Sequence, residues 1–300
     1  MKANIYSIRK QNLLFVLQII APAFLLAFII LYYPIINSIM ISIQNRHLGK
    51  VEYKWAGLEN FIEVFSSGKF LYSFWWTIVF GVLSSILLFI VGMYFALLLN
   101  RKMKGTNVIR GILLMPWAIP VFVNAFLWLW LLNVQFGLIN YILVTLKVLK
   151  EPIHWTGGSF IAKVSVIMAF VWRAFPFNMI VYLAAFQTID PVYYEASEID
   201  GAGKFKQFIY ITLPSIRNII IFTMLLNFIW SFQEFTTIWI LTRGGPAEAT
   251  NTLITRVFMI SFLQRDFGIA AANGVIWIIF LIAFSLIYLR LLFFRKDETI

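Results

Sequence analysis

The chain has 300 residues, of which 61% are hydrophobic and 12% charged, and its formal net charge is +11. Soluble domains are typically about 45–50% apolar and about 25% charged, so this composition excludes a large soluble core and indicates an integral membrane protein. The absence of cysteine excludes disulfides, thiol catalysis and cysteine-ligated metals. The positive charge does not indicate a nucleic-acid groove, because Lys and Arg lie mostly at the ends of apolar runs, as membrane anchors do.

Six apolar segments are long enough to cross a bilayer as helices, which takes about 20 residues. The first is too long for the apolar region of a signal peptide and lacks a small-residue cleavage site, so we expect it to be a retained span. The sequence therefore predicts an all-α integral membrane fold, with one transmembrane domain over residues 1–300. In chain order the predicted spans are 13–36, 70–99, 108–132, 160–187, 216–241 and 268–294.

The distribution of Lys and Arg predicts which side of the membrane each loop faces. Six spans place both termini on one side. With that side inside, the short cytoplasmic segments carry a higher density of basic residues than the longer outer loops. We therefore expect both termini to be cytoplasmic. The outer loops are then 37–69, 133–159 and 242–267, and residues 136–147 are apolar enough for a short helix at the bilayer surface.

The segment 190–214 is a charged stretch between two long apolar runs, and in this orientation it lies on the cytoplasmic side. Asp190 and Pro191 form a helix start, because Asp caps free N–H groups and Pro is tolerated in the first turn. Gly201 and Gly203 then permit a turn that residues with side chains resist. A second short helix, about residues 204–210, is expected to end before Pro214.

This segment is predicted to be a helix–turn–helix with one small, apolar face. Such a face suits docking into a groove on a soluble partner. An amphipathic connector without any partner fits the same residues equally well. The face consists of Ala196, Ile199, Ala202 and Phe205.

Polar residues recur along one face of the fifth span. Polar groups within a span are costly and tend to face a bundle interior or a cavity. Glu234 is the only carboxylate well within a span, and carboxylates and amides bind sugar hydroxyls, while aromatic rings offer apolar faces for sugar rings. The alternatives are a gate, or hydrogen bonding between helices with an ion pair between Glu234 and Arg173 of the fourth span. The stripe comprises Thr223, Asn227, Trp230, Ser231 and Glu234, with Gln233 beside it.

Other polar or kinked positions have structural interpretations. Pro176 should kink the fourth span, and kinked helices often line cavities. Asn124 in the third span and Asn273 in the sixth fit hydrogen bonds between helices better than ligand contact. His47 and His154 lie far apart in outer loops without the spacing of metal ligands, so no metal site is predicted.

The motifs of the inner loop resemble the EAA loop of the permeases of ATP-binding-cassette (ABC) importers. They are Glu195-Ala196-Ser197, Asp200-Gly201-Ala202 and Ile211-Thr212-Leu213-Pro214, with Ser197 where the family commonly has Ala. Four further segments resemble the same family in the same order along the chain, at 55–61, 115–120, 136–140 and 241–246. The last contains Gly244-Gly245-Pro246, which is typical of carbohydrate permeases of the maltose and glycerol-phosphate type.

The resemblance implies a type I ABC importer permease fold, with six spans and a cytoplasmic coupling-helix loop over residues 190–214. The residues implied in coupling to the ATPase are Glu195, Ala196, Asp200, Gly201, Ala202, Phe205 and Pro214. Those implied in docking an extracytoplasmic solute-binding protein are Gly244, Gly245 and Pro246. The candidate substrate path then comprises Arg173, Asn227, Trp230, Ser231, Gln233 and Glu234.

The implied assembly imports a sugar or oligosaccharide across a bacterial cytoplasmic (inner) membrane. By resemblance, this permease pairs with a second, homologous permease and with a dimer of ABC ATPase subunits. The chain has no P-loop sequence, so no cofactor is predicted in it, and ATP and Mg²⁺ are expected on the partner ATPase. The chain is therefore predicted to be a transport subunit and not an enzyme.

Three other functions stay open. An ABC permease for amino acids, peptides or an anion would share the inner loop, although the Gly244-Gly245-Pro246 motif weighs against it. An ion-coupled secondary transporter would work without an ATPase and would need a titratable membrane carboxylate, for which Glu234 is the candidate. An intramembrane enzyme has the least support, because the sequence shows no catalytic pair or metal cluster.

Overall fold

The computed structural model describes residues 18–47, 49, 54–101 and 104–294, which form two compact units. One unit holds residues 1–66 and 260–276, and the other holds residues 67–259 and 277–300. Within the described residues, four helices are long and apolar enough to cross a membrane, and up to six spans result if each of two bent helix pairs counts as one. The four are Gln18–Ser42, Gly68–Leu99, Ser159–Phe186 and Phe267–Arg290.

The smaller unit begins with the helix Gln18–Ser42, which contains the π-helical turn η1 (Phe28–Tyr32) and ends as α2 (Tyr33–Ser42). It extends past the predicted end at residue 36, and within the added part the Ser38 hydroxyl donates to Pro34 O of the same helix at 2.8 Å. Residues 13–17 of the predicted span lie outside the described part of the chain.

A short hairpin and a helix follow in the same unit. Strand β1 (Gln44–Asn45) pairs antiparallel with β2 (Lys54–Trp55), and α3 (Glu59–Ser66) comes next. The buried Asn60 amide donates to Ser42 O at 2.8 Å and to Gln44 O at 2.9 Å, so α3 is fastened where the first helix ends.

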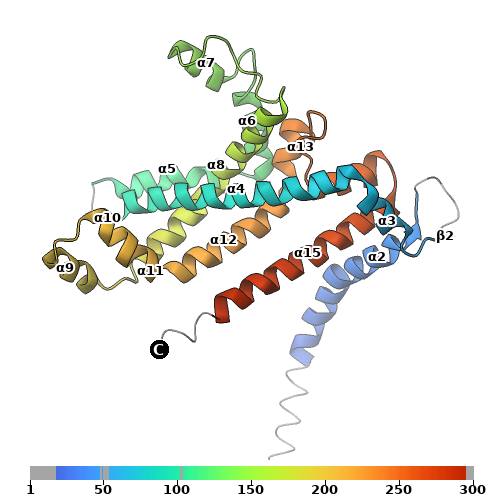
Figure 1. Cartoon of the computed structure of the whole chain (residues 1–300), viewed down its shortest axis with the longest axis horizontal. Coiled ribbons are helices and arrows are strands. Elements are labelled where there is room, and N and C mark those ends of the chain that lie inside the picture. The colour runs from blue at the N-terminus through green and yellow to red at the C-terminus, as the bar shows by residue number, and fades with distance from the viewer. Residues whose placement is uncertain (1–17, 48, 50–53, 102–103, 295–300) are drawn as a thin grey trace, which may run out of the picture. The chain divides into compact units, whose positions relative to one another are not determined.

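The larger unit is built around three helices, α4 (Gly68–Leu99), α8 (Ser159–Phe186) and α12 (Arg217–Phe232), which pack against one another (Figure 1). Aromatic side chains fill their interface, with Phe80 and Phe170 at 5.4 Å between ring centroids. The remaining elements of this unit are α5 (Thr106–Ala118), α6 (Val121–Leu131), α7 (Leu138–Thr145), α9 (Pro191–Ile199), α10 (Lys204–Gln207), η2 (Phe208–Thr212), α11 (Leu213–Ser215), α13 (Thr236–Thr242), α14 (Leu253–Phe258) and the later part of α15 (Phe267–Phe294).

Small residues on α4 let the neighbouring helices come close. A Cβ at Gly92 would lie 2.6 Å from the Cβ of Asn178 on α8, and a Cβ at Gly81 would lie 2.8 Å from Ser231 Oγ on α12. Small residues at such crossings are the usual means of close helix packing in membranes, where backbone approach replaces the hydrophobic effect.

Two of the predicted spans are interrupted. Helices α5 and α6 meet at an angle of 97°, because Ile119 precedes Pro120 and both adopt extended ψ values. The helical stretch Lys204–Ser215 and α12 meet at 71° around Ile216, and α12 itself ends at Phe232, before α13. The predicted spans 108–132 and 216–241 are therefore each made of two helices.

Prolines within the other helical stretches do not end them. Helix α8 runs through Pro176 without a break. The inner-loop helix also continues through Pro214 to Ser215, which corrects the expectation that it would end before this proline. The π-helical turn η2 lies directly before this proline and explains why the helix continues. In η2, Leu213 N–H bonds to Phe208 O, five residues earlier, and this wider helical turn leaves space for the proline side chain.

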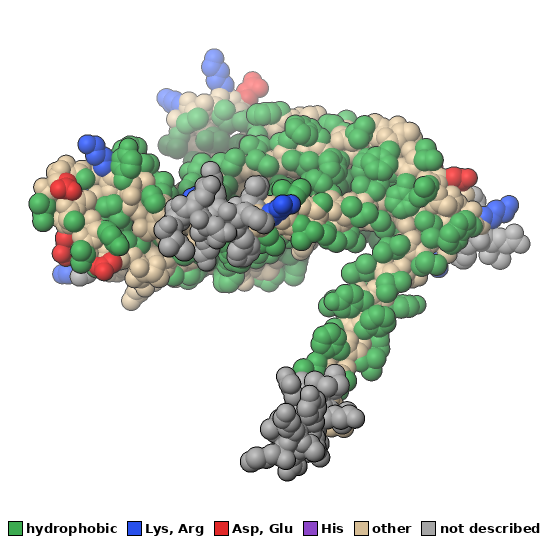
Figure 2. Space-filling model, turned by 60° about the horizontal axis from the view of Figure 1, so that its bottom comes forward, with side chains coloured by type: hydrophobic (Ala, Val, Ile, Leu, Met, Phe, Trp, Pro, Cys, Tyr) green, Lys and Arg blue, Asp and Glu red, His purple; other side chains and the backbone are tan. Residues whose placement is uncertain are grey.

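The surface matches a protein that lies in lipid. Hydrophobic side chains cover most of the visible face, and charged side chains gather at the end formed by α9 and α10 (Figure 2). Exposed residues of α4 include Trp75, Ile90 and Tyr94, which a soluble bundle would bury. The predicted all-α membrane fold is confirmed, and a short helix, α7, lies within the predicted segment 136–147.

We predict that Gly92→Ala destabilises the protein while Gly111→Ala does not. The added methyl group at residue 92 meets Asn178 at 2.6 Å, whereas a Cβ at residue 111 on α5 meets nothing within 4 Å. Overpacking of this kind costs about 1–3 kcal/mol. The measurement is the thermal unfolding midpoint of the purified protein in nanodiscs, and equal midpoints for Gly92→Ala and the wild type would contradict the close packing.

Candidate functional site: a membrane pocket between two helix breaks

A pocket of about 390 Å³ lies where the two interrupted spans meet α8. The end of α5 and the start of α6 contribute one side, and the end of α12 and the start of α13 contribute another. Non-helical backbone at membrane depth is tolerated where it is buried in protein or lines a cavity, and broken helices are a common way to build a ligand site there. The lining residues are Trp117, Val121, Phe170, Arg173, Ala174, Trp230, Gln233, Glu234, Phe235 and Thr236.

An ion pair crosses this pocket. Arg173 Nη2 lies 3.5 Å from Glu234 Oε2, and the other carboxylate oxygen, Oε1, accepts a hydrogen bond from Thr237 N at 2.8 Å. Glu234 therefore caps the N-terminus of α13 while it neutralises Arg173. Its side chain is only 6% exposed, so both contacts are needed to offset the cost of removing a carboxylate from water.

Aromatic side chains form the pocket wall beside this pair. Trp230 is exposed toward the pocket, and its ring lies edge-on to Phe177 with centroids 4.9 Å apart. Trp117 contacts the same Phe177 ring at 6.3 Å. Gln233 adds an exposed amide at the end of α12. The pocket thus combines apolar ring faces with an amide, a guanidinium and a carboxylate.

The predicted polar stripe of the fifth span divides into two groups. Trp230, Gln233 and Glu234 line the pocket together with Arg173. Asn227 and Ser231 are fully buried between helices instead, as is Thr223.

Asn227 and Thr223 connect α12 to α8. The Asn227 and Asn178 amides exchange two hydrogen bonds, of 2.8 and 3.2 Å, and Tyr182 Oη lies 2.8 Å from Thr223 Oγ1. For Asn227 and Thr223, the structure therefore agrees with the alternative interpretation of the fifth span, in which its polar residues form hydrogen bonds between helices. Asn178 and Tyr182 were not singled out from the sequence, although their spacing of four residues places both on one face of α8.

The two asparagines predicted to bond between helices do not do so within the described residues. Asn273 donates to Ile269 O of its own helix, and neither amide atom of the buried Asn124 has a hydrogen-bond partner there. Within the same residues, no group of three or more His, Asp or Glu side chains could hold a metal ion.

The inner loop forms the predicted helix–turn–helix. Asp190 caps α9 by accepting from Val192 N at 3.0 Å, and Gly201 has the left-handed φ of +75° that the turn requires. Two contacts join α9 to α10 across this turn. Lys204 pairs with Glu198 at 2.8 Å, and Gln207 Nε2 donates to Ser197 Oγ at 2.9 Å. The hydrogen bond from Lys204 lowers the pKa of the Glu198 carboxyl.

This loop presents apolar side chains to solvent. Ile199 is 87% exposed and Phe205 is 78% exposed, far more than isolated large apolar residues need to be. Of the residues predicted for coupling, Ala202 is half-buried, and the exposed ones are Glu195, Ala196, Asp200, Gly201, Phe205 and Pro214. The loop thus exposes large apolar side chains beside charged ones.

The predicted docking motif on the outer side is a tight turn. Gly244 is buried, and a Cβ there would meet the Asn251 side chain at 3.3 Å. Gly245 and Pro246, which are joined by a cis peptide bond, are half-buried. The residues that this turn exposes are Arg243 and Ala247. The three motif residues therefore shape the turn, while its neighbours reach solvent.

Comparison with known proteins gives one consistent family. The family model described as "Binding-protein-dependent transport system inner membrane component" matches residues 88–295. A trehalose/maltose transport system permease protein of Thermococcus litoralis is 36% identical over 91% of this chain and 90% of its own length. An sn-glycerol-3-phosphate transport system permease protein of Yersinia pestis is 30% identical over 91% of this chain and 92% of its own.

Solved structures show the same fold. A chain of a bacterial ABC transporter involved in the import of the acidic polysaccharide alginate aligns with a TM-score of 0.79 and 21% identity, over 99% of this chain and 100% of that one. A chain of a bacterial alginate ABC transporter, in complex with an alginate pentasaccharide-bound periplasmic protein, aligns with a TM-score of 0.80 and 22% identity, over 94% of each chain.

Proposed function

Because the chain belongs to the family of binding-protein-dependent transport system inner membrane components, we propose that it is the permease subunit of an ABC importer for a sugar or oligosaccharide. The observation that carries the proposal is the pocket at the two helix breaks. It offers ring faces for the apolar side of a sugar, and amide, carboxylate and guanidinium groups for its hydroxyls. The substrates named for its relatives, trehalose, maltose and glycerol phosphate, are all rich in hydroxyl groups.

The charge balance of the pocket favours an uncharged saccharide. Arg173 and Glu234 are paired, so their formal charges cancel, and the pocket lining has no second cation to meet a phosphate or a carboxylate. An anionic substrate would therefore have to displace Glu234 from Arg173 and disturb the cap of α13. A neutral sugar can bind both groups through hydroxyls without breaking the pair.

Three partners complete the proposed importer. A second, homologous permease supplies the other half of the membrane pathway, a dimer of ABC ATPases binds ATP and Mg²⁺, and an extracytoplasmic solute-binding protein delivers the sugar. The exposed apolar surface of the inner loop and the absence of a P-loop sequence support the separate ATPase. The termini are proposed to be cytoplasmic, because this places the inner loop on the side where ATP is available.

Transport in this proposal is alternating access. Closure of the ATPase dimer moves the inner loop, and α8 and α12 follow because the loop connects them directly. The helices then move as near-rigid bodies around a pocket at membrane depth. The chain itself makes and breaks no covalent bond.

The proposal is tested by reconstituting this chain in liposomes with a homologous permease, an ABC ATPase and a solute-binding protein from the same organism. We expect uptake of a radiolabelled neutral oligosaccharide that requires both ATP and the binding protein. Uptake driven by an ion gradient without ATP would instead support the secondary-transporter alternative, with Glu234 as its titrating group.

We predict that Gly201→Val uncouples the importer and that Gly203→Val does not. Both positions are exposed with open space for a side chain, but Gly201 has a φ of +75° and Gly203 has −69°. A left-handed conformation costs a side-chained residue about 1–2 kcal/mol, so only the first change distorts the turn between α9 and α10.

The measurement for this pair is sugar-stimulated ATP hydrolysis by the assembled complex. We expect Gly201→Val to lower it about tenfold, because a turn strained by 1–2 kcal/mol is populated about ten times less. Gel filtration provides the check that the complex still assembles. An equal loss in Gly203→Val would show that the backbone conformation at residue 201 is not the cause.

We predict that Glu234→Ala impairs transport more than it impairs assembly. The change leaves Arg173 without its counter-charge and removes the cap from α13, so the pocket loses its shape. The measurement is the initial rate of uptake beside the yield of assembled complex. The control is Glu151→Ala, since Glu151 is an exposed residue of an outer loop. Unchanged uptake kinetics in Glu234→Ala would mean that the pocket is not on the substrate path.

A further inference from the structure

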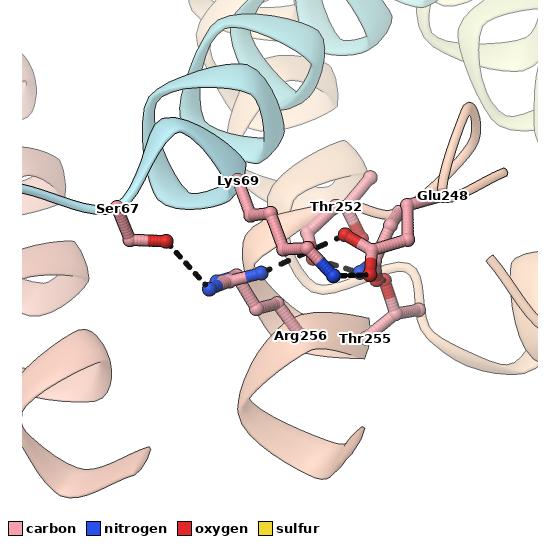
Figure 3. Close-up of polar contacts among 7 residues, drawn as sticks. Ser67, Lys69, Glu248, Thr252, Thr255 and Arg256 are labelled. Carbon is pink, nitrogen blue, oxygen red and sulfur yellow. Dashed lines mark hydrogen bonds and ion pairs between the residues drawn. The ribbon is translucent and has the colours of Figure 1, made fainter. Parts of the chain in front are cut away.

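A cluster of charges holds the outer turn to the start of α4. Lys69 Nζ lies 2.6 Å from Glu248 Oε1, and Arg256 Nη1 lies 3.8 Å from Glu248 Oε2 (Figure 3). Arg256 also donates through Nη2 to Ser67 Oγ at 3.3 Å. One carboxylate therefore joins a cation on α4 to a cation on α14. We name Lys69, Glu248 and Arg256 the outer clip.

The two ion pairs of the outer clip differ in strength. The side chain of Lys69 is 65% exposed, so salt and water screen its contact with Glu248. Arg256 is only 12% exposed, and burial lowers the pKa of its guanidinium while the Glu248 carboxylate opposes this shift. Loss of Glu248 would leave Arg256 partly buried without its carboxylate, which is the costlier consequence.

The backbone at the outer clip is strained. Ala247 and Glu248 have φ values of +48° and +61°, and such left-handed conformations are unfavourable for residues with a side chain. Two consecutive residues of this kind persist only where the surrounding contacts over-determine them. Backbone strain of this kind is often found at functional sites, so it indicates that the conformation of this outer loop has a functional role.

Other contacts fix the same segment to the same helix. Tyr72 Oη donates to Ala249 O at 3.0 Å, and Leu253 N donates to Thr77 Oγ1 at 2.9 Å. With Lys69, these contacts spread along the first three turns of α4. Among these residues Glu248 is the nearest in sequence to the exposed tip residue Ala247. Within the turn itself, Thr250 N donates to Gly244 O at 3.0 Å and Thr250 Oγ1 donates to Gly245 O at 2.9 Å.

We propose that Glu248 is a positioning residue, whose pairing with Lys69 and Arg256 holds the turn Arg243–Ala247 in the shape on which the solute-binding protein docks. This inference rests on the proposed function, because it takes the outer turn to face that partner. It assigns the docking contact to the exposed Arg243 and Ala247, and it gives Gly244, Gly245 and Pro246 the role of building the turn. An exposed cation at the tip suits a partner surface with acidic groups.

The test uses Glu248→Gln, with Glu151→Gln as the matched control. Both changes remove one negative charge from an outer loop, but Glu151 is exposed and belongs to none of the ion pairs found within the described residues. The first measurement is the affinity of the sugar-loaded binding protein for the complete importer in nanodiscs. We expect Glu248→Gln to weaken it about fivefold, because both ion pairs of the outer clip lose their carboxylate, and Glu151→Gln to leave it unchanged.

The second measurement follows the turn itself and needs no partner protein. The chain contains no cysteine, so Ala247→Cys provides a unique site for a spin label. We expect Glu248→Gln to increase the mobility of this label, and Lys69→Gln to increase it less, because the Lys69 contact is the more exposed one. High salt should raise the mobility in the wild type toward that of Lys69→Gln.

Different outcomes would contradict the positioning role of Glu248 and the proposed function of the chain. Equal label mobility in Glu248→Gln and the wild-type background would overturn the positioning role. Increased mobility with unchanged binding-protein affinity would overturn the link to docking. Failure of the wild-type importer to bind any solute-binding protein would instead contradict the proposed function, and it would appear in the wild type and the control alike.

Discussion

The contact on which the membrane pocket depends is the carboxylate of Glu234. It accepts from Thr237 N in the first turn of α13 and pairs with Arg173 on α8, so it joins two segments that are far apart in sequence. A chain that breaks a helix inside a membrane must satisfy the freed backbone groups within the protein, because lipid offers no hydrogen bonds. Glu234 does so at the break between α12 and α13, and this allows the pocket to exist there.

The pocket is mechanically connected to the inner loop. Helix α8 carries Arg173 and ends only a few residues before α9, and the inner-loop helix leads into α12, which ends beside Glu234. The Asn178–Asn227 pair and the Tyr182–Thr223 contact lock α8 to α12 between these two points. In the proposed importer, a displacement of the inner loop would therefore reach the pocket through two helices that are joined to each other.

Local chemistry explains which parts of the molecule could be predicted from the sequence. The helix cap at Asp190 and the left-handed turn at Gly201 follow from the residues themselves, and both were predicted. The length of the apolar segments located the spans, but it could not reveal the breaks near Pro120 and Phe232, because apolar residues resume within a few residues of each break. Periodicity placed the polar residues of the fifth span on one face.

The division of that face is a tertiary effect. Asn227 turns to a partner amide on α8, whereas Glu234 lies beyond the helix end and turns to Arg173. The periodicity of one helix predicts neither where α8 packs against it nor where α12 ends. The same limit applies to the outer turn, where the Gly244-Gly245-Pro246 motif was recognisable but the burial of Gly244 depends on Asn251, seven residues later.

Helix α4 contacts both the outer turn and the two helices that line the pocket. Its first turns hold the outer turn through Lys69, Tyr72 and Thr77, and its middle admits α12 and α8 at Gly81 and Gly92. Because glycine permits backbone approach on this helix, α12 and α8 pack directly on the element that anchors the outer turn. The outer turn and the pocket helices are thus in contact with one helix, and α8 and α12 continue from it to the inner loop. In the proposed importer, docking at the outer turn would then have a physical route to the inner loop, where the ATPase is proposed to bind.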